Sequence, residues 1–334
     1  MKIRIGTFNL FQFVEPPFSW YVKKDKFNQE QWEEKTNWIT KQVTSMNCDI
    51  VGFQEVFSAS ALKKLVFDLG YKYFETVQTA RVDKKNDKVY VSTTVAIASK
   101  FPIDEILNVE PNITSIKKHN FEGFFKFSRD PIKVKITLPN EQKILVYVCH
   151  LKSNWQNEFE YVFTKNDTLQ DKMKIVQKAL KEGYSESLKQ RLCEASSLFF
   201  DINKSKNTPT ILMCDLNDKE FSLTIDALSN KSYHYDSKKD GYILLDAYNL
   251  YDKQIYNPHP EQTQIKRPPT SFFAGKGNAL DYIFVSKNIN KNHPNKIAHI
   301  SSYEIFDEHL KKNQNGSLLQ SDHAQVVCEI TFEK

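Results

Sequence analysis

The chain has 334 residues, of which 40% are apolar and 13% aromatic, and its formal net charge is +5. This composition supplies ample material for a buried core and excludes a disordered tail, and no apolar run approaches the ~20 residues that a membrane-spanning helix needs. The mild positive excess, nearly all of it from lysine, suits an anionic partner without identifying one.

The first part of the chain alternates between strands and helices. We expect a strand over residues 2–10, an aromatic and proline-containing loop over 11–21, and a second strand over 49–53. A helix is predicted over 28–46 because apolar residues recur there at near-heptad spacing, namely Trp32, Ile39, Val43 and Met46. A further helix is expected to stop at Gly70 and to bury one apolar face, formed by Leu62, Leu65, Val66 and Leu69.

Strand-like segments dominate the middle of the chain. Four are predicted, over residues 71–77, 93–99, 132–138 and 143–150. The third alternates apolar and polar residues with period two, which is typical of a half-buried strand. Polar residues 156–182 are expected to be weakly helical, a firmer helix is predicted over 186–202, and a short apolar strand follows over 209–214.

The last part of the chain contains two expected loops and two final strands. The loops cover residues 229–241 and 252–269, and the strands cover 280–285 and 324–332. Strands joined by short connections outnumber helical crossovers, which favours an α+β fold of largely antiparallel sheets covered by outer helices. We expect a single domain over 1–334, with insertions near 156–185 and 229–269.

The cysteine usage indicates a reducing compartment. The five cysteines are odd in number and far apart, and no Cys-x-x-Cys pair exists, so zinc and dithiol chemistry are not expected. No signal-peptide pattern is visible at the N-terminus, and we therefore expect a soluble, cytoplasmic and monomeric protein without stable membrane association. Secretion after removal of a presequence stays open.

Polar residues with catalytic potential stand at the ends or starts of six predicted strands. Taken alone, Asp215 and Asn217 could simply open a turn, because Asp and Asn are favoured there. Six such positions are harder to explain as turns, since all are residue types that bind a hard cation, accept a proton or orient a phosphate. They are Asn9, Glu55, His150, Asp215 with Asn217, Asp281, and Asp322 with His323.

The segments that carry these residues occur in a recognisable order. They run from Thr7-Phe8-Asn9 through Gly52-Phe53-Gln54-Glu55, His150-Leu151, Cys214-Asp215-Leu216-Asn217 and Leu280-Asp281-Tyr282-Ile283 to Ser321-Asp322-His323. This ordered set resembles the endonuclease/exonuclease/phosphatase superfamily, which includes deoxyribonucleases, apurinic-site endonucleases, bacterial sphingomyelinases and inositol-polyphosphate phosphatases. The resemblance implies a four-layer α/β/β/α sandwich with the site at one edge of two facing sheets.

The resemblance also implies a metal site. Glu55 would be the main ligand of Mg²⁺, which prefers few carboxylates and keeps several waters. Asn9 would lie beside the metal and the phosphate, and Asp322 would add a ligand or hold its neighbour. Mn²⁺ and Ca²⁺ are the alternative cofactors.

The proton-handling residues follow from the same resemblance. His323 would lie against the phosphate as acid or base, with Asp281 fixing its tautomer. Asp215 would orient or deprotonate the attacking water, and Asn217 would hydrogen-bond a phosphate oxygen. His150 matches the second histidine of the deoxyribonuclease and sphingomyelinase branches, where it faces the leaving group.

Three residues are candidates for binding substrate. Arg129, followed by Asp130 and Pro131, resembles the Arg-Glu-Pro element of deoxyribonuclease-like members, although an arginine before a strand could equally be an exposed surface residue. Lys152 and Ser153 follow His150 and could also contact a phosphate. Inositol phosphatases typically have an aromatic residue after the Asn and a Trp-Cys-Asp-Arg segment. Both features are absent here, which argues against that branch.

These features lead to three functional hypotheses. The first is a Mg²⁺-dependent nuclease that hydrolyses DNA or RNA, with nucleic acid as the partner. The second is a phospholipid phosphodiesterase of the sphingomyelinase kind, or another phosphatase of the same superfamily. Its membrane-docking segment would be the aromatic loop 11–21 or residues 121–127. The third, a catalytically silent scaffold, predicts loss of a ligand or an acid/base residue, and none is missing.

Overall fold

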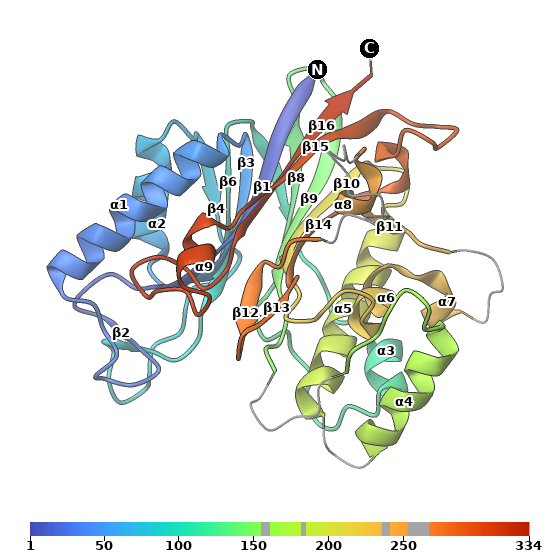
Figure 1. Cartoon of the computed structure of the whole chain (residues 1–334), viewed down its shortest axis with the longest axis horizontal. Helices are drawn as coiled ribbons and strands as arrows, with labels where there is room; N and C mark the ends of the chain where they lie inside the picture. The colour runs from blue at the N-terminus through green and yellow to red at the C-terminus, as the bar shows by residue number, and fades with distance from the viewer. Residues whose placement is uncertain (155–160, 182–184, 236–240, 253–266, 334) are drawn as a thin grey trace, which may run out of the picture.

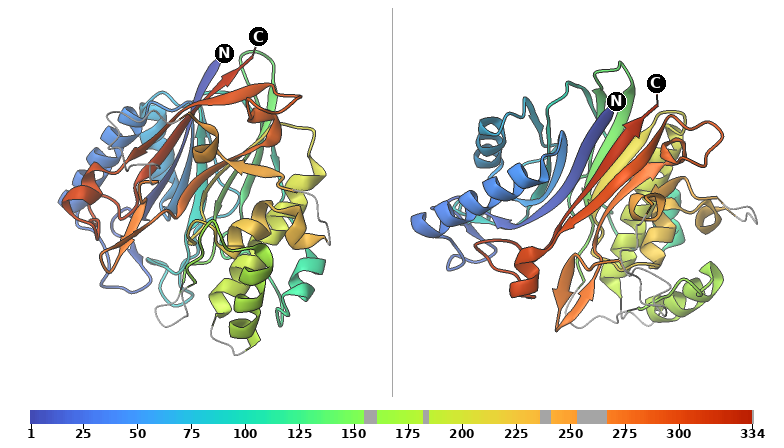
Figure 2. Two further views of the ribbon diagram at one scale, coloured as in Figure 1. Left: turned by 45° about the vertical axis from the view of Figure 1, so that its right-hand side comes forward. Right: turned by 45° about the horizontal axis from the view of Figure 1, so that its top comes forward.

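The computed structural model describes residues 1–154, 161–181, 185–235, 241–252 and 267–333. Two six-stranded, mainly antiparallel sheets face each other, and helices cover both outer sides, which gives an α+β fold in four layers (Figure 1). The rotated views in Figure 2 keep α1 on one side of the sheets and α4 on the other. Among the described residues, none of the helices combines the length and apolarity that a bilayer crossing requires.

The first sheet contains both ends of the chain. Its strands, in spatial order, are β15 (Ala298–Phe306), β16 (Gln325–Phe332), β1 (Lys2–Phe13), β3 (Ile50–Val56), β6 (Thr94–Ser99) and β4 (Tyr73–Glu75). Its outer face packs against α1 (Gln29–Met46) and α2 (Ala59–Asp68). The capping box of Asn28 and Gln31 starts α1, because each side chain bonds the other residue's backbone N–H.

The second sheet carries the larger helical layer. Its strands, in spatial order, are β11 (Leu244–Asp246), β14 (Asp281–Ser286), β10 (Thr210–Asp215), β9 (Lys143–His150), β8 (Ile132–Thr137) and β7 (Ile103–Leu107). The main helices on its outer side are α3 (Ile113–Lys118), α4 (Leu169–Lys181), α5 (Glu186–Lys204) and α6 (Leu223–Ser229) (Figure 1). The shorter helices are α7 (Lys231–His234), α8 (Ala247–Leu250), η1 (Lys287–Ile289) and α9 (Glu308–Lys312).

Two small strand pairs complete the described structure. They are β2 (Ser19–Trp20) with β5 (Val89–Tyr90), and β12 (Ser271–Phe273) with β13 (Lys276–Asn278). The backbone of Ser271 forms a bridge with His323, so the β12–β13 hairpin is attached beside one of the predicted site residues.

The two sheets approach closely because of a glycine. Alternate residues of β1, such as Ile3 and Ile5, enter the apolar layer between the sheets, while Phe8 and Leu10 face the outer helices. In β3, a Cβ atom on Gly52 would lie 3.0 Å from both methyl carbons of Val148 on the opposite sheet. A larger residue would therefore push the sheets apart near the ends of their central strands.

The strand directions bring the polar strand ends to one edge. β1 is parallel to β3, and β9 is parallel to β10, so the carboxyl ends of each pair lie together. β16 and β14 are antiparallel to β1 and β10, so they begin where those strands end. Within the second sheet, Asp215 pairs with both His150 and Asp281. The sequence prediction of one shared edge is thus correct.

Several predicted boundaries differ from the structure. The expected loop 11–21 is wrong at its start, because β1 continues to Phe13 after an irregularity in its pairing with β3. The predicted strand 71–77 shortens to Tyr73–Glu75, which is all that pairs with β6. Of the described residues 161–181 in the 156–182 segment, Leu169–Lys181 are helical, and α7 lies inside the expected loop 229–241. Residues 155–160, 182–184, 236–240 and 253–266, which include parts of both expected insertions, lie outside the described residues.

Candidate active site

Asp215 is the centre of a buried hydrogen-bonded cluster at this edge. Its Oδ2 accepts a hydrogen bond from the Asn9 amide at 3.0 Å and lies 3.4 Å from His150 Nε2 and 3.9 Å from His323 Nδ1. His323 Nδ1 donates to Asp281 Oδ2 at 2.8 Å. Both aspartates are fully buried. Five of the residues singled out in the sequence therefore meet in one cluster, which joins the two sheets.

The charges in this cluster shift the protonation of its members. Burial raises the pKa of Asp215 to about 7. The charge of His323 opposes this rise, and the charge of Asp281 adds to it. Burial alone would lower the pKa of His323, but the charges of Asp281 and Asp215 outweigh it and hold that pKa well above its ordinary value. His323 is thus a cation at neutral pH, and Asp215 can exchange a proton there.

His150 has the opposite protonation. Burial, followed by the nearby charges of Arg129 and His323, lowers the pKa of His150 well below its ordinary value, so the ring is neutral. Its Nδ1 atom is buried and has no hydrogen-bond partner among the described residues. A neutral imidazole can donate or accept a hydrogen bond, but it is a poor source of protons.

Two carboxylates form a second group beside the first sheet, Glu55 in β3 and Asp322 just before β16. Burial raises the pKa of Asp322 to about 6, with the His323 charge opposing the shift and the Glu55 charge adding to it. Asp322 Oδ1 is buried and has no hydrogen-bond partner among the described residues. Glu55 Oε2 accepts a hydrogen bond from the Gln12 backbone N–H at 3.0 Å. Two nearby carboxylates, one with a buried oxygen that lacks a partner, fit a hard divalent cation.

Asn9 links the two groups. Its Nδ2 is used by Asp215, and its Oδ1 accepts from the Phe11 backbone N–H at 3.0 Å. An amide oxygen has a second lone pair, so Asn9 remains able to contact a cation. The amide therefore fixes the orientation of Asp215 whether or not it also binds metal.

Asp215, Asp281 and His323 also lie close enough to one another to hold a metal ion. Ligand atoms of Asp215, Asp281 and His323 lie within 4.8 Å of one another. However, His323 Nδ1 already donates to Asp281, and a protonated imidazole has no lone pair for a cation. This trio suits proton handling better than metal binding, whereas Glu55 and Asp322 suit the metal.

Unusual backbone conformations at two strand ends set the directions of the Glu55 and Asn217 side chains. Glu55 and Asn217 have φ angles of 58° and 51°, in the left-handed region that non-glycine residues rarely occupy. Such conformations cost about 1–3 kcal/mol each and cluster at functional sites. Asn217 is held by two hydrogen bonds: its N–H donates to Asp215 Oδ1 at 2.8 Å, and its amide donates to the Leu151 carbonyl at 3.0 Å.

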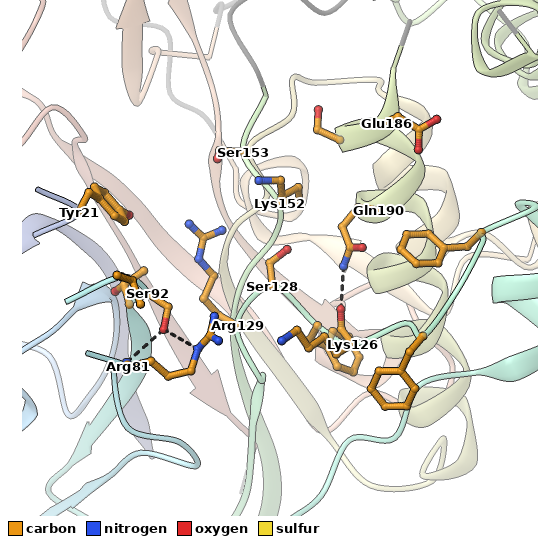
Figure 3. Close-up of a pocket in the computed structure, with 16 residues that line it drawn as sticks. Tyr21, Arg81, Ser92, Lys126, Ser128, Arg129, Lys152, Ser153, Glu186 and Gln190 are labelled. Atoms are coloured by element: carbon orange, nitrogen blue, oxygen red, sulfur yellow. Dashed lines mark hydrogen bonds between the residues drawn. The ribbon is translucent and has the colours of Figure 1, made fainter. Parts of the chain in front are cut away.

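The three predicted substrate-binding residues line one hollow. Arg129, Lys152 and Ser153 all face a cavity of about 1130 Å³ (Figure 3). Arg129 Nη1 donates to the carbonyl of Leu151, the residue after His150, at 3.1 Å. Tyr21 also lines the cavity, and its pKa is raised by burial and then by the charge of Glu55. The cavity therefore adjoins both the histidine side and the carboxylate side of the site.

Sequence reasoning missed Glu194 and Lys35. Buried Glu194 accepts hydrogen bonds from the backbone N–H groups of Ser128 and Lys152 at 2.7 and 2.8 Å, so it holds the two segments that carry the basic residues. It stands three residues after Arg191 in an Arg-x-x-Glu segment of α5, which the sequence suggests only as a structural element of a helix. Arg191, at the start of that segment, donates to the Lys152 carbonyl at 3.0 Å.

Lys35 is a fully buried lysine behind the carboxylates. Its Nζ donates to the carbonyls of Phe11, Leu318 and Gln320 at 2.8, 2.7 and 3.0 Å. Burial lowers the pKa of Lys35 to about 7, and the charges of Glu55 and Asp322 oppose this shift. A sequence signal exists, because Lys35 lies between Trp32 and Ile39 on the apolar stripe of α1, where a charge is unexpected.

Comparison with known proteins identifies the family. The model of the endonuclease/exonuclease/phosphatase family matches residues 6–323. The chain belongs to this family. It is therefore a hydrolase of phosphoric ester bonds and, more closely, a metal-dependent phosphoesterase. No sequence among the curated proteins matches the chain.

Solved structures show the same fold at low sequence identity. The human Nocturnin catalytic domain with a bound sulfate anion is 16% identical, with a TM-score of 0.59 over 99% of this chain and 94% of that chain. D. rerio TDP2 in complex with a single-strand DNA product is 12% identical, with a TM-score of 0.53 over 99% of each chain. A mannosyl-6-phosphatase from Bacteroides thetaiotaomicron is 16% identical, with a TM-score of 0.53 over 99% of this chain and 100% of that chain.

Proposed function

We propose that this phosphoesterase is a Mg²⁺-dependent nuclease that hydrolyses phosphodiester bonds of nucleic acid. The observation that carries the proposal is the basic cavity beside the cluster, in which Arg129 and Lys152 adjoin His150. A phosphomonoester needs only the reacting phosphate to be held, whereas a nucleic acid extends further and brings more phosphates. The structure of D. rerio TDP2 with a single-strand DNA product lends support by analogy.

In this proposal Asp215 accepts a proton from the attacking water. The water oxygen forms a bond to phosphorus, and the bond from phosphorus to the leaving oxygen breaks. His323, protonated and held through Nδ1 by Asp281, uses its Nε2–H to stabilise the phosphate and to supply the proton that the leaving oxygen takes up. Neutral His150 acts as a hydrogen-bonding group on the leaving-group side, and Asn217 donates to a phosphate oxygen.

Glu55 and Asp322 would hold the divalent cation, with the Asn9 amide oxygen beside it. When bound, the cation supplies positive charge that stabilises the negative charge of the reacting phosphate. Mn²⁺ or Ca²⁺ could replace Mg²⁺ on the same oxygen ligands.

A phosphodiesterase acting on phospholipids is the second candidate. One observation favours it: Phe124, in the 121–127 segment, has 91% of its surface exposed. Phe125 and Phe127 of the same segment are buried, as is Trp20 of the other aromatic segment. Tyr21 of that other segment is 48% exposed. Two exposed rings on separate segments offer little area for membrane docking, so the nuclease proposal comes first.

The test is a hydrolysis panel with Mg²⁺ or with chelator. It covers single-stranded DNA, RNA, duplex DNA, sphingomyelin, a sugar phosphate and bis(p-nitrophenyl) phosphate. The matched control is the His323→Ala protein purified in parallel, because trace nucleases contaminate many preparations. Mg²⁺-dependent cleavage of nucleic acid by the wild type alone supports the proposal; hydrolysis restricted to the lipid or to the sugar phosphate overturns it.

A further inference from the structure

The cavity beside the active site carries more positive charge than the reacting phosphate needs. Four cationic side chains line it, Arg81, Lys126, Arg129 and Lys152, against one carboxylate, Glu186. They come from three segments of the chain, which carry Arg81, Lys126 with Arg129, and Lys152, as Figure 3 shows. An excess of this size inside one concave surface favours an anionic ligand.

Only part of this charge serves the catalytic cluster. Arg129 affects the pKa of His150 and bonds the carbonyl of Leu151. Arg81 comes from a different segment, where its Nε and its backbone N–H both donate to Ser92 Oγ, at 3.2 and 3.1 Å (Figure 3). Lys126 is exposed on the segment before Arg129, and its backbone carbonyl accepts from Gln190 at 2.9 Å. Arg81 and Lys126 are thus available to a part of the ligand beyond the reacting phosphate.

The segment that carries Lys126 also holds an exposed aromatic ring. Phe124 lines the cavity with 91% of its surface exposed. Its segment is anchored by edge-to-face contacts of Phe125 with Phe121 and Phe127, at centroid distances of 5.2 and 5.8 Å. An exposed ring on an anchored segment provides a flat surface at low entropic cost, and a nucleobase stacks on such a surface when it is not paired.

We propose that this cavity binds the nucleotides next to the scissile bond of a single-stranded nucleic acid, with an unpaired base on Phe124 and a flanking phosphate between Arg81 and Lys126. The inference rests on the nuclease proposal and deepens it by naming the strandedness of the substrate. A duplex hides the faces of its bases in the stack, so it cannot use Phe124 in this way.

The test compares a short oligonucleotide with a minimal ester. Phe124→Ala and Lys126→Ala are assayed on a ten-nucleotide single strand, on its duplex and on bis(p-nitrophenyl) phosphate. Removing a stacking ring weakens binding by about 1–3 kcal/mol per base, so the ratio of the oligonucleotide KM to the minimal-ester KM should rise roughly tenfold for Phe124→Ala. Matched controls are Phe67→Ala on α2 and Lys41→Ala on α1, which are exposed outside the cavity lining and should keep the wild-type ratio.

Salt dependence separates a phosphate contact from a merely structural change. For Lys126→Ala, the slope of log binding constant against log salt concentration should become less negative by about 0.7, the value for one phosphate contact on a single strand. An unchanged ratio and slope in both variants, or a duplex that is preferred by the wild type, overturns the inference while the nuclease proposal stands. Hydrolysis of the minimal ester with no cleavage of any nucleic acid overturns the nuclease proposal itself.

Discussion

Asp215 and His323 share one electrostatic environment but carry different charges. Burial disfavours the charged form of each, yet His323 has two carboxylates close to it and remains protonated. Asp215 lies beside one cation and one further carboxylate, and its pKa rises to about 7. The pair therefore offers a base that titrates near neutrality and an acid that stays charged, which is the combination that hydrolysis at neutral pH needs.

The pH dependence of turnover should report Asp215. Below its pKa of about 7 the carboxyl is protonated and cannot accept a proton from water. We expect kcat/KM to rise tenfold per pH unit up to about pH 7 and then to level off, with the rate at pH 5 roughly 100-fold below the plateau. The measurement is a pH–rate profile on bis(p-nitrophenyl) phosphate at saturating Mg²⁺. A flat profile between pH 5 and 8 would exclude Asp215 as the base.

Asp281→Asn should lower both the pKa of His323 and the rate. The substitution removes the charge that stabilises the imidazolium and replaces the charged acceptor 2.8 Å from Nδ1 by a neutral, weaker amide oxygen. We expect the ring to titrate closer to its ordinary value and kcat to fall by roughly 10²–10⁴-fold. NMR titration of the histidine rings measures the first effect. Asp68→Asn, at an exposed carboxylate on α2, is the control and should change neither quantity.

At the scale of residues, the candidate site residues that could be predicted from the sequence are those whose type and position both indicate chemistry. Asp215 and His323 stand at strand ends, where a polar residue after an apolar run is visible without a structure. Glu194 and Lys35 are different, because their importance comes from backbone groups more than 20 residues away. Only the interruption of the apolar stripe in α1 gave a hint of Lys35, and the Arg-x-x-Glu pattern of α5 does not reveal which backbone groups Glu194 binds.

At the scale of elements, close contact between β3 and the opposite sheet fixes where Glu55 stands. Gly52 comes three residues before Glu55, and a Cβ atom there would lie 3.0 Å from Val148 and 3.2 Å from Met213. Little room exists for it, because these neighbours are themselves buried. The approach of the two sheets at this point therefore depends on the missing side chain.

Gly52→Ala should destabilise the fold, and Val148→Ala should relieve the effect. Overpacking of a filled core typically costs about 1–3 kcal/mol, and we expect a loss of this size in the free energy of unfolding in urea. Removing the two methyl groups of Val148 creates the space that the new Cβ needs. The double variant should accordingly be more stable than the sum of the two single changes predicts. Additive losses would contradict the close-contact explanation.

The elements that sequence reasoning missed have irregular patterns. β15 was not predicted, since its pairing with β16 shifts register between Ile300 and Ser302 and its apolar residues lose their alternation. The same applies to the end of β1, where Phe11 and Gln12 adopt positive φ angles. Strands with regular alternation, such as β8, were found at nearly their observed bounds.

At the scale of the whole molecule, the two sheets supply different parts of the site. Asn9 and Glu55 come from strands of the first sheet, and Asp322 and His323 directly precede its strand β16. The residues of the second sheet are His150, Asp215 and Asp281. Two hydrogen bonds cross the gap, from Asn9 to Asp215 and from His323 to Asp281. The ordered motifs in the sequence predicted that these residues converge, but the division between the sheets needed the strand order. The proposed metal ligands thus lie on the side of the first sheet, whereas the proposed proton transfer combines Asp215 of the second sheet with His323 beside the first.

Metal binding should therefore stabilise the protein through the first sheet alone. A cation that binds only the folded state raises its stability by RT ln(1 + [metal]/Kd), or about 2.7 kcal/mol at 100 times Kd. We expect Mg²⁺ to raise the Tm of the wild type and of Asp215→Asn, and chelator to reverse the rise. Glu55→Gln and Asp322→Asn should lose most of the response, because they remove the proposed ligands. If Asp215→Asn lost the response while Glu55→Gln kept it, the cation would bind in the second sheet, and the assignment of metal and base would have to be exchanged.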